Sequence, residues 1–301
     1  VADAPHGQHA ANFVALTPLS FLQRTADIYP QREALIYNQR RYSWAQVRNR
    51  CTRIASSLAA RGIGKNDTVS IFAFNTPEMF ESHFSIPMAG AVLNTINTRL
   101  DADTVAYIID HAESRLFICD RQLWPVLEEA LQSCTGRPEI VIIDDIDATE
   151  KPALPTDIEF SFYEDLVDRG DDTFTWRPPE TEWQALTLNY TSGTTGRPKG
   201  VVYHHRGSYL MTMGTVVSWA LPPHPRYLYT VPMFHCNGWG HAWTMTALAA
   251  TIVCIRAFVP KLFFDLVEEH EVTHFGGAPI VLNMLALAPK EDQKRFAHTV
   301  H

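Results

Sequence analysis

The sequence contains no uninterrupted apolar run of the roughly 18 to 20 residues that a membrane-spanning helix requires. Its first residues, VADAPHGQ, lack the basic stretch followed by an apolar one that is typical of a secretory signal. The five cysteines are scattered without CxxC spacing, which indicates reduced thiols rather than a disulfide framework. These absences predict a cytoplasmic protein with no membrane span.

Positive charge is also scarce. The chain has 25 Lys and Arg against 33 Asp and Glu, a net charge of -8, and no long basic run. Such a surface argues against a nucleic-acid partner, because nucleic-acid binding needs a basic patch. An anionic ligand would have to be held by a local basic group instead.

The 301 residues, 46% of them hydrophobic, are enough for a large core and about two domains. Ser43 and Gln46 have the spacing of a capping box at the start of an amphipathic helix that Gly62 ends. Thr76 and Pro77 open a second helix, which places apolar residues and a histidine on one side. These residues are Met79, Phe80, His83 and Phe84.

Short runs rich in apolar and β-branched residues alternate with these helical stretches. The runs are residues 68–73, 91–94, 116–119, 139–143 and 185–190. This alternation predicts an α/β fold of mostly parallel sheets flanked by helices. Acidic and Pro-containing segments precede Trp183, so we expect a first α/β subdomain over residues 1–183 and a second over residues 184–301.

Residues 191–200 read TSGTTGRPKG and follow the last of these runs. Glycines can turn the backbone through positive φ and bring its amides close to an anion, hydroxyls can donate to phosphate oxygens, and the lysine supplies positive charge. The candidate phosphate-binding residues are Thr191, Ser192, Gly193, Thr194, Thr195, Gly196 and Lys199. A polar surface turn is the alternative for a short glycine cluster.

The spacing of this loop is GxxGxxK rather than GxxxxGK[ST], and a β-branched run, residues 201–203, follows where a Walker loop would open a helix. A plain P-loop ATPase is therefore disfavoured. The whole block YTSGTTGRPKGV resembles the nucleotide signature of the adenylate-forming superfamily, which includes acyl-CoA synthetases, coumarate-type ligases, peptide-synthetase adenylation domains and beetle luciferases.

The resemblance extends from about Phe21 onward and implies ATP and Mg²⁺ as cofactors. In this family the substrate carboxylate attacks the α-phosphorus to give an acyl adenylate and pyrophosphate, and Lys199 and Thr195 match catalytic positions. The stretches RYSW from Arg41 and LNTINTR from Leu93 are similar to fatty acyl and aryl CoA ligases. The implied function is activation of a carboxylic acid, short- or medium-chain fatty by preference, followed by transfer to CoA.

Two further blocks resemble the acyl side of these ligases. Residues 231–239, VPMFHCNGW, place His235 between the acyl pocket and the nucleotide, and Trp239 is either a ligand contact or a core aromatic. A hydrogen-bonded core histidine is the alternative for His235. Residues 274–279, HFGGAP, are expected to line the acyl passage, unless they form only a tight turn at a strand end. The candidate lining residues are Gly276, Gly277, Ala278 and Pro279.

Several histidines and a cysteine lie near these blocks without the spacing of a zinc site, so we expect no metal cage and Mg²⁺ held mainly by ATP. They are His204, His205, His235, Cys236 and His241.

The family continues beyond the block at residues 274–279, so the chain is expected to be an amino-terminal part with weak or no turnover. A luciferase-type oxidoreductase and a non-catalytic acyl- or nucleotide-binding module remain alternatives. The oligomeric state is open, and a homodimer is compatible with the sequence.

Overall fold

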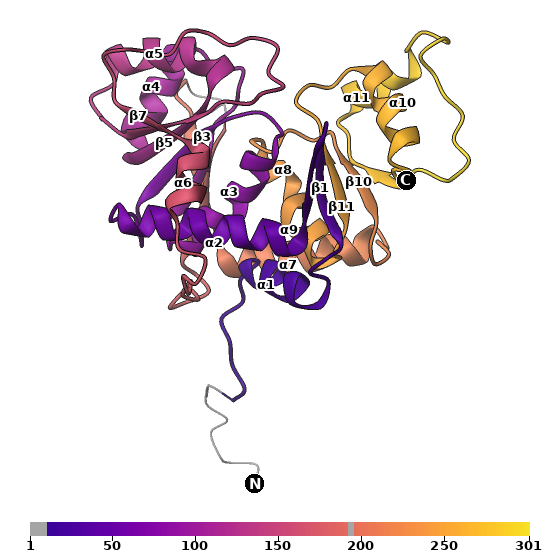
Figure 1. Ribbon diagram of the computed structural model, residues 1–301, viewed down its shortest axis with the longest axis horizontal. Helices are drawn as coiled ribbons and strands as arrows, with labels where there is room; N and C mark the ends of the chain where they lie inside the picture. The colour runs from indigo at the N-terminus through magenta and orange to yellow at the C-terminus, as the bar shows by residue number, and fades with distance from the viewer. Residues whose placement is uncertain (1–10, 192–195) are drawn as a thin grey trace.

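The computed structural model describes residues 11–191 and 196–301. It contains two sheets, with helices between them and on their outer sides (Figure 1). Most neighbouring strands are parallel, which confirms the predicted α/β class.

The first sheet has seven strands in the order β7-β6-β5-β3-β4-β8-β9. All neighbours are parallel except β8 and β9, which form an antiparallel hairpin at one edge. The strands are β3 (Thr68–Phe72), β4 (Val92–Thr95), β5 (Ser114–Asp120), β6 (Glu139–Ile143), β7 (Phe160–Phe162), β8 (Ala185–Thr191) and β9 (Lys199–His204).

The second sheet has five strands in the order β12-β10-β11-β1-β2, and β2 is its antiparallel edge strand. The strands are β1 (Glu33–Tyr37), β2 (Arg40–Ser43), β10 (Arg226–Tyr229), β11 (Thr251–Cys254) and β12 (His274–Phe275). The sheets do not divide at Trp183, because strands from both sides of that residue enter each sheet. The two subdomains expected on either side of Trp183 therefore stay a prediction and do not correspond to one sheet each.

Helices connect the strands and cover the sheets. They are α1 (Leu19–Ile28), α2 (Trp44–Ala60), α3 (Pro77–Met88), α4 (Ala102–His111), α5 (Trp124–Ser133), α6 (Tyr163–Arg169), α7 (His205–Ser218), α8 (Cys236–Trp239), α9 (His241–Ala247), α10 (Pro260–Glu269) and α11 (Pro279–Ala286), with a 3₁₀ turn at Arg121–Leu123. Within the described ranges, none of them is both long enough and apolar enough to cross a membrane.

The predicted start of α2 is confirmed. The Ser43 hydroxyl accepts a hydrogen bond from the Gln46 backbone N–H, and the Gln46 side chain accepts one from the Ser43 N–H. This capping box satisfies two of the backbone donors that a helix start leaves free. The helix ends at Ala60, just before Gly62 takes a φ of 73°.

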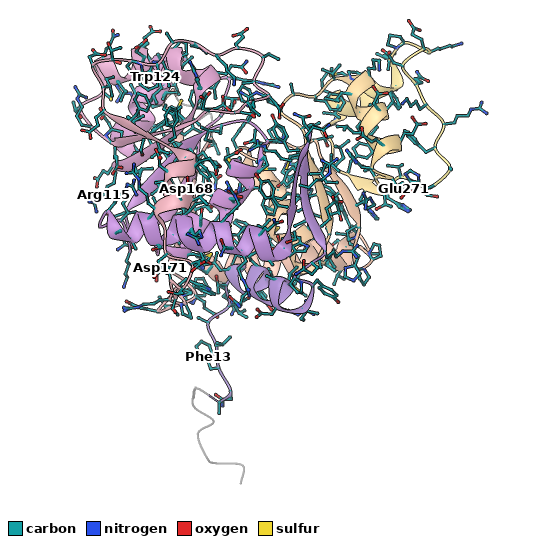
Figure 2. All side chains as sticks on the ribbon, in the orientation of Figure 1. Phe13, Arg115, Trp124, Asp168, Asp171 and Glu271 are labelled. Carbon is teal, nitrogen blue, oxygen red and sulfur yellow. The ribbon has the colours of Figure 1, made fainter. Side chains whose placement is uncertain are left out.

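Side chains of the parallel strands alternate between two cores. In β5, Leu116 and Ile118 face the large core between the sheets, whereas Phe117 and Cys119 face the outer core under α4 and α5. Trp124, labelled in Figure 2, is 1% exposed and belongs to that outer core. A third cluster lies between the second sheet and α10.

The layers are thus helix, sheet, helix, sheet, helix. The predicted helix is confirmed as α3, and it is buried on every side, not only on the side of Met79, Phe80, His83 and Phe84. It packs in the large core that both sheets share, which leaves no face for solvent.

Candidate active site

The phosphate-loop candidates lie at the open end of the β8–β9 hairpin. Thr191 pairs in register with Lys199, and both side chains are exposed beside the connecting loop. The strand expected after the loop is confirmed as β9. Gly196 has the positive φ expected of it, 115°, and apart from its chain neighbours no described residue lies within 4 Å of where a Cβ would stand. The candidates Ser192, Gly193, Thr194 and Thr195 lie outside the described residues.

The VPMFHCNGW block enters the site as a left-handed turn. The φ values are positive throughout α8 and at Gly240: 48° at Cys236, 52° at Asn237, 57° at Gly238, 58° at Trp239 and 68° at Gly240. A non-glycine residue loses roughly 1–2 kcal/mol in this conformation, so consecutive left-handed residues need strong support from their surroundings.

That support comes from buried polar side chains. Asn237 is fully buried, and its Oδ1 accepts hydrogen bonds from Thr187 Oγ1 and Asn189 Nδ2, each at 2.9 Å. Both donors belong to β8, the strand that leads into the phosphate loop. Thr95 Oγ1 lies 2.9 Å from the carbonyl oxygen of Phe234. The turn is therefore tied to the same strands that position the loop.

Asn75, just after β3, fixes the start of the same block. Its Nδ2 donates to the carbonyl oxygens of Tyr229 and Val231 at 3.0 and 2.8 Å, and its Oδ1 accepts from the Met233 N–H at 2.7 Å. Sequence reasoning did not identify Asn75, Thr95, Thr187, Asn189 or Asn237. Asn and Thr inside otherwise apolar strand runs were the available signal, because buried polar groups need partners.

His235 and Trp239 are both exposed on this turn, and the exposed fraction of Trp239 is 38%. The exposure of His235 argues against the alternative of a buried core histidine. Trp239 lines a cavity of about 330 Å³. The other lining residues are Val202, Tyr203, His204, Gly207, Ser208, Met211 and Cys236.

The cavity has one wall from β9, one from α7 and one from the left-handed turn. Sequence reasoning missed the α7 wall, formed by Gly207, Ser208 and Met211. The signal would have been that α7 begins directly after the strand that follows the loop. The wall also contains polar groups: burial, aided by a hydrogen bond with the Cys236 thiol, raises the pKa of Tyr203 to about 12.

The HFGGAP block is not part of this cavity. Gly276 is buried, and its carbonyl oxygen accepts a hydrogen bond from Thr230 Oγ1. A Cβ at Gly276 would stand 3.2 Å from His241 Cε1, so only a glycine fits without displacing that ring. Gly277 is half-buried, whereas Ala278 and Pro279 are exposed at the start of α11. These four candidates are therefore not among the residues that line the cavity, although His241 beside Gly276 also meets the Trp239 ring, with centroids 5.8 Å apart.

The nearby histidines have individual partners. His205 Nδ1 lies 2.8 Å from Thr17 Oγ1, and His241 Nδ1 lies 2.5 Å from the Tyr227 hydroxyl. Burial lowers the pKa of both His205 and His241 to about 4, which keeps them neutral at physiological pH. Among residues 11–191 and 196–301, no three His, Cys, Asp or Glu side chains come together as a metal cage.

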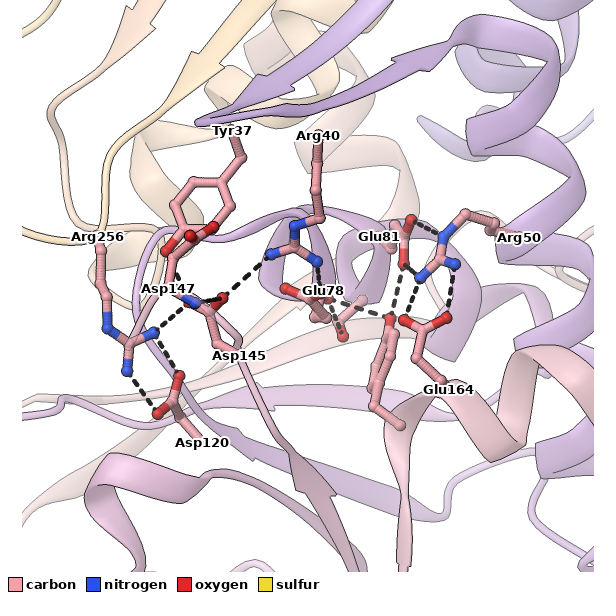
Figure 3. Close-up of polar contacts among 12 residues, drawn as sticks. Tyr37, Arg40, Arg50, Glu78, Glu81, Asp120, Asp145, Asp147, Glu164 and Arg256 are labelled. Carbon is pink, nitrogen blue, oxygen red and sulfur yellow. Dashed lines mark hydrogen bonds and ion pairs between the residues drawn. The ribbon is translucent and has the colours of Figure 1, made fainter. Parts of the chain in front are cut away.

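A buried ion cluster joins the carboxyl-terminal ends of strands from both sheets (Figure 3). Arg256, just after β11, contacts Asp120 at 2.6 Å and Asp145 at 2.8 Å. Asp145 also accepts a hydrogen bond of 2.6 Å from the Tyr37 hydroxyl. Burial raises the pKa of Asp120, although Arg256 opposes that shift.

The same cluster continues along α3. Arg40 pairs with Glu78 at 2.5 Å, and Arg50 pairs with Glu81 at 2.6 Å (Figure 3). The phosphate-loop hairpin and Asn75 also lie at carboxyl-terminal strand ends, the edge where ligands bind in α/β sheets. Ion pairs on one side and the Asn237 network on the other therefore fix the relative position of the two sheets at this edge.

Comparison with known proteins agrees with this arrangement. Residues 22–301 match the family described as AMP-binding enzyme. The chain belongs to this family. The match spans the phosphate loop, the left-handed turn and the HFGGAP block together, so the predicted membership is confirmed.

The family relatives include named CoA ligases. The chain is 43% identical over 303 residues to the peroxisomal acetate/butyrate–CoA ligase AAE7 of Arabidopsis thaliana, covering 97% of the chain and 53% of that protein. It is 43% identical over 278 residues to the 2-methylpropanoate–CoA ligase CCL4 of Humulus lupulus, covering 91% and 50%. The chain thus spans about half the length of these relatives.

The fold is shared with solved structures at lower identity. The inhibitor-bound N-terminal domain of FACL13 from Mycobacterium tuberculosis matches with a TM-score of 0.78 and 23% identity, over 92% of this chain and 67% of that one. At this identity the likeness supports the fold, and residue roles have to be argued from the site itself.

Proposed function

We propose that the full-length protein of this chain is an AMP-forming acid–thiol ligase. It activates a carboxylic acid with ATP to an acyl adenylate and transfers the acyl group to CoA. One observation carries the proposal: β9 begins at Lys199 beside the phosphate loop and continues into the wall of the 330 Å³ cavity at Val202, Tyr203 and His204. A carboxylate at the mouth of that cavity would lie next to the phosphates.

The described part of the loop fits a triphosphate. Lys199 offers an exposed cation, Thr191 an exposed hydroxyl, and Gly196 an open backbone that a phosphate oxygen can approach. Thr195 and the neighbouring hydroxyls would complete the grip. Mg²⁺ arriving with ATP would neutralise part of the phosphate charge, and Lys199 would stabilise the charge that develops on the leaving pyrophosphate.

The acyl group is proposed to occupy the cavity, with Trp239 in its wall; His235 is not among the lining residues, and we propose that it acts from the same turn, at the nucleotide side. A volume of about 330 Å³ is at the small end of ligand pockets, and Val202, Met211 and Trp239 supply apolar walls. The names of the relatives mention acetate, butyrate and 2-methylpropanoate. We therefore propose short-chain acids as substrates. Gly276 and its neighbours stay candidates for a passage outside this cavity.

The cellular location and the oligomeric state remain proposals. Several relatives are named as peroxisomal, so a peroxisomal protein is the alternative to the cytoplasmic one predicted from sequence. A homodimer can be tested by sedimentation of the extended protein.

The decisive test is carboxylate-dependent ATP–pyrophosphate exchange, run on this chain and on a version extended past His301 along its coding sequence. Acetate, butyrate, 2-methylpropanoate, octanoate and benzoate form the panel of acids. We expect exchange in the extended protein, fastest with the short aliphatic acids, and little or none in the 301-residue chain. Addition of CoA should then yield the acyl thioester.

Other outcomes separate the alternatives. Exchange followed by oxygen uptake without thioester formation would indicate the luciferase-type reaction. A folded extended protein that binds acid but shows no exchange would indicate a non-catalytic module and remove the catalytic role of Lys199. Faster exchange with octanoate than with butyrate would overturn the short-chain proposal alone.

A further inference from the structure

Two aromatic side chains of α4 lie against the base of the phosphate loop. Tyr107 and His111 are one helical turn apart, so they project from the same face, and their ring centroids are 5.2 Å apart. They are far from the loop in sequence: 79 positions separate His111 from Tyr190, and 91 separate Tyr107 from Pro198. Neither belongs to any of the blocks that resemble the family.

His111 contacts the arm that enters the loop. Its Nδ1 lies 2.7 Å from the hydroxyl of Tyr190, the residue just before Thr191, and the two rings meet edge to face with centroids 5.7 Å apart. Burial raises the pKa of Tyr190 to about 12, so the phenol keeps its proton and can donate a hydrogen bond to the imidazole. The Tyr107 ring is nearly perpendicular to the Tyr190 ring, and their centroids are 6.5 Å apart.

Tyr107 contacts the arm that leaves the loop. Its hydroxyl donates a hydrogen bond of 3.2 Å to the carbonyl oxygen of Pro198. The guanidinium of Arg197 stands over the Tyr107 ring, 5.4 Å from its centroid, at the range of a cation–π contact. One residue of α4 therefore holds the backbone and a side chain of the outgoing arm.

A hollow lies beside these contacts in the described part of the chain. Its volume is about 670 Å³, and its lining includes Tyr107 and His111 of α4 as well as Gly196 and Arg197. At the edge of this hollow, the two rings contact Tyr190 on one arm and Arg197 and Pro198 on the other. Removing them would leave the sheet intact and release the loop arms on the α4 side.

We infer that Tyr107 and His111 are positioning residues that set the geometry of the phosphate loop by holding both of its arms on α4. This inference rests on the proposed function. The physical reason is that ordering a loop on ligand binding costs conformational entropy, which reduces affinity for the ligand that the loop contacts. If the arms of the phosphate loop are already held in place, binding of ATP or pyrophosphate costs less conformational entropy. Binding of the acid is unaffected, because the acid does not contact the loop.

A purely structural role predicts something else. Loss of packing under the hairpin would lower the unfolding free energy. It would also lower the exchange rate without a change in KM that is specific to ATP. A positioning role predicts a rise in KM for ATP and pyrophosphate, while KM for the acid stays constant. This split separates the two explanations.

The test uses the extended protein and ATP–pyrophosphate exchange. Tyr107→Phe keeps the ring and removes only the bond to Pro198, so we expect KM for ATP to rise about five-fold, the effect of one net hydrogen bond. Tyr107→Leu also removes the contact with Arg197 and should raise KM for ATP further. KM for butyrate should change less than about two-fold in both variants. Tyr29→Phe, at the far end of α1 beside His224, is the matched control and should match wild type.

A double-mutant cycle tests the second arm. His111→Ala and Tyr190→Phe each remove one partner of the same hydrogen bond. If the pair acts as a unit, the double variant should have nearly the same KM for ATP as either single variant. Fully additive effects would contradict a coupled clamp.

Trypsin digestion supplies a readout that does not depend on activity. Arg197 precedes Pro198 and resists trypsin, so Lys199 is the reporter at this arm. Tyr107→Leu should speed cleavage after Lys199 several-fold and leave cleavage after Lys65 unchanged. Absence of exchange in wild type would reject the proposed function, while the cleavage pattern would still test the clamp. Wild-type exchange with unchanged KM for ATP and unchanged cleavage in the Tyr107 variants would overturn this inference.

Discussion

Lys199 is the residue on which the proposed chemistry depends most. Lys199→Met in the extended protein should reduce exchange by about 100-fold or more, because a preorganised cation near the developing charge is lost. Its side chain is exposed, so the unfolding free energy should stay near that of wild type. Exchange rates and urea unfolding measure the two effects.

The control for Lys199 is Lys261→Met, which removes an exposed lysine paired with Asp265 on α10. It should leave exchange unchanged. A Lys199 variant that exchanges at the wild-type rate would contradict the phosphate role of the loop.

The left-handed turn makes a second prediction at the residue scale. At Gly238, φ is 57°, and an added Cβ would stand 2.3 Å from the buried Tyr229 hydroxyl. Gly238→Ala should therefore lower the unfolding free energy by about 2–3 kcal/mol through strain and overpacking. Gly214 in α7 has nothing within 4 Å, so Gly214→Ala should be neutral or stabilising by up to about 1 kcal/mol. Equal effects in urea unfolding would contradict the strain argument.

Buried histidines predict a pH dependence. Burial lowers the pKa of His83, His205 and His241 to about 4 in the folded protein, below the ordinary histidine pKa of about 6.5. The unfolded chain therefore binds more protons between these values, so stability should fall as pH drops from about 6.5 to about 4. Each histidine contributes on the order of 3 kcal/mol at most over this range.

The slope of unfolding free energy against pH measures this effect. His205→Asn should flatten it, since asparagine can keep a hydrogen bond to Thr17 without titrating. A slope that is identical in the variant and in wild type would show that His205 does not carry the linkage.

At the scale of elements, the start of α2 is the clearest case of local sequence control. Ser43→Ala removes a capping box that the structure contains, and it should cost about 1 kcal/mol. Thr76 also occupies an N-cap position, at α3, but its buried hydroxyl has no hydrogen-bond partner within the described residues. Thr76→Val should thus cost less than Ser43→Ala, or stabilise. Urea unfolding of both variants measures the two losses. A larger loss of unfolding free energy in Thr76→Val than in Ser43→Ala would contradict this explanation.

Sequence periodicity located elements well and burial less well. Strand runs such as residues 116–119 and 139–143 became β5 and β6 because continuous apolar and β-branched runs suit parallel strands that are buried on both faces. For α3, the same kind of reasoning placed Met79, Phe80, His83 and Phe84 on one side and did not address burial of the opposite side. Its position between two sheets, which only tertiary packing creates, buries it on all sides.

At the scale of the whole molecule, Arg256 joins the two sheets. Arg256→Met leaves Asp120 buried without its cation and leaves Asp145 with its longer ion pair to Arg40, at 3.5 Å, so the unfolding free energy should fall by about 3–5 kcal/mol. Arg115→Met is the control, since its pair with Asp67 is half-exposed and should contribute about 1 kcal/mol or less. Similar losses in both variants would argue against a special role of the cluster.

The sequence by itself determined the α/β class, the phosphate-loop block and the family. Each depends on local spacing of residue types, and local spacing is written along the chain. The left-handed turn at Asn237, the α7 wall of the cavity and the α4 contacts at Tyr107 were decided by tertiary structure alone. In each of these features, residues far apart in the chain meet because each sheet combines strands from before and after Trp183. No local sequence pattern specifies which strands become neighbours.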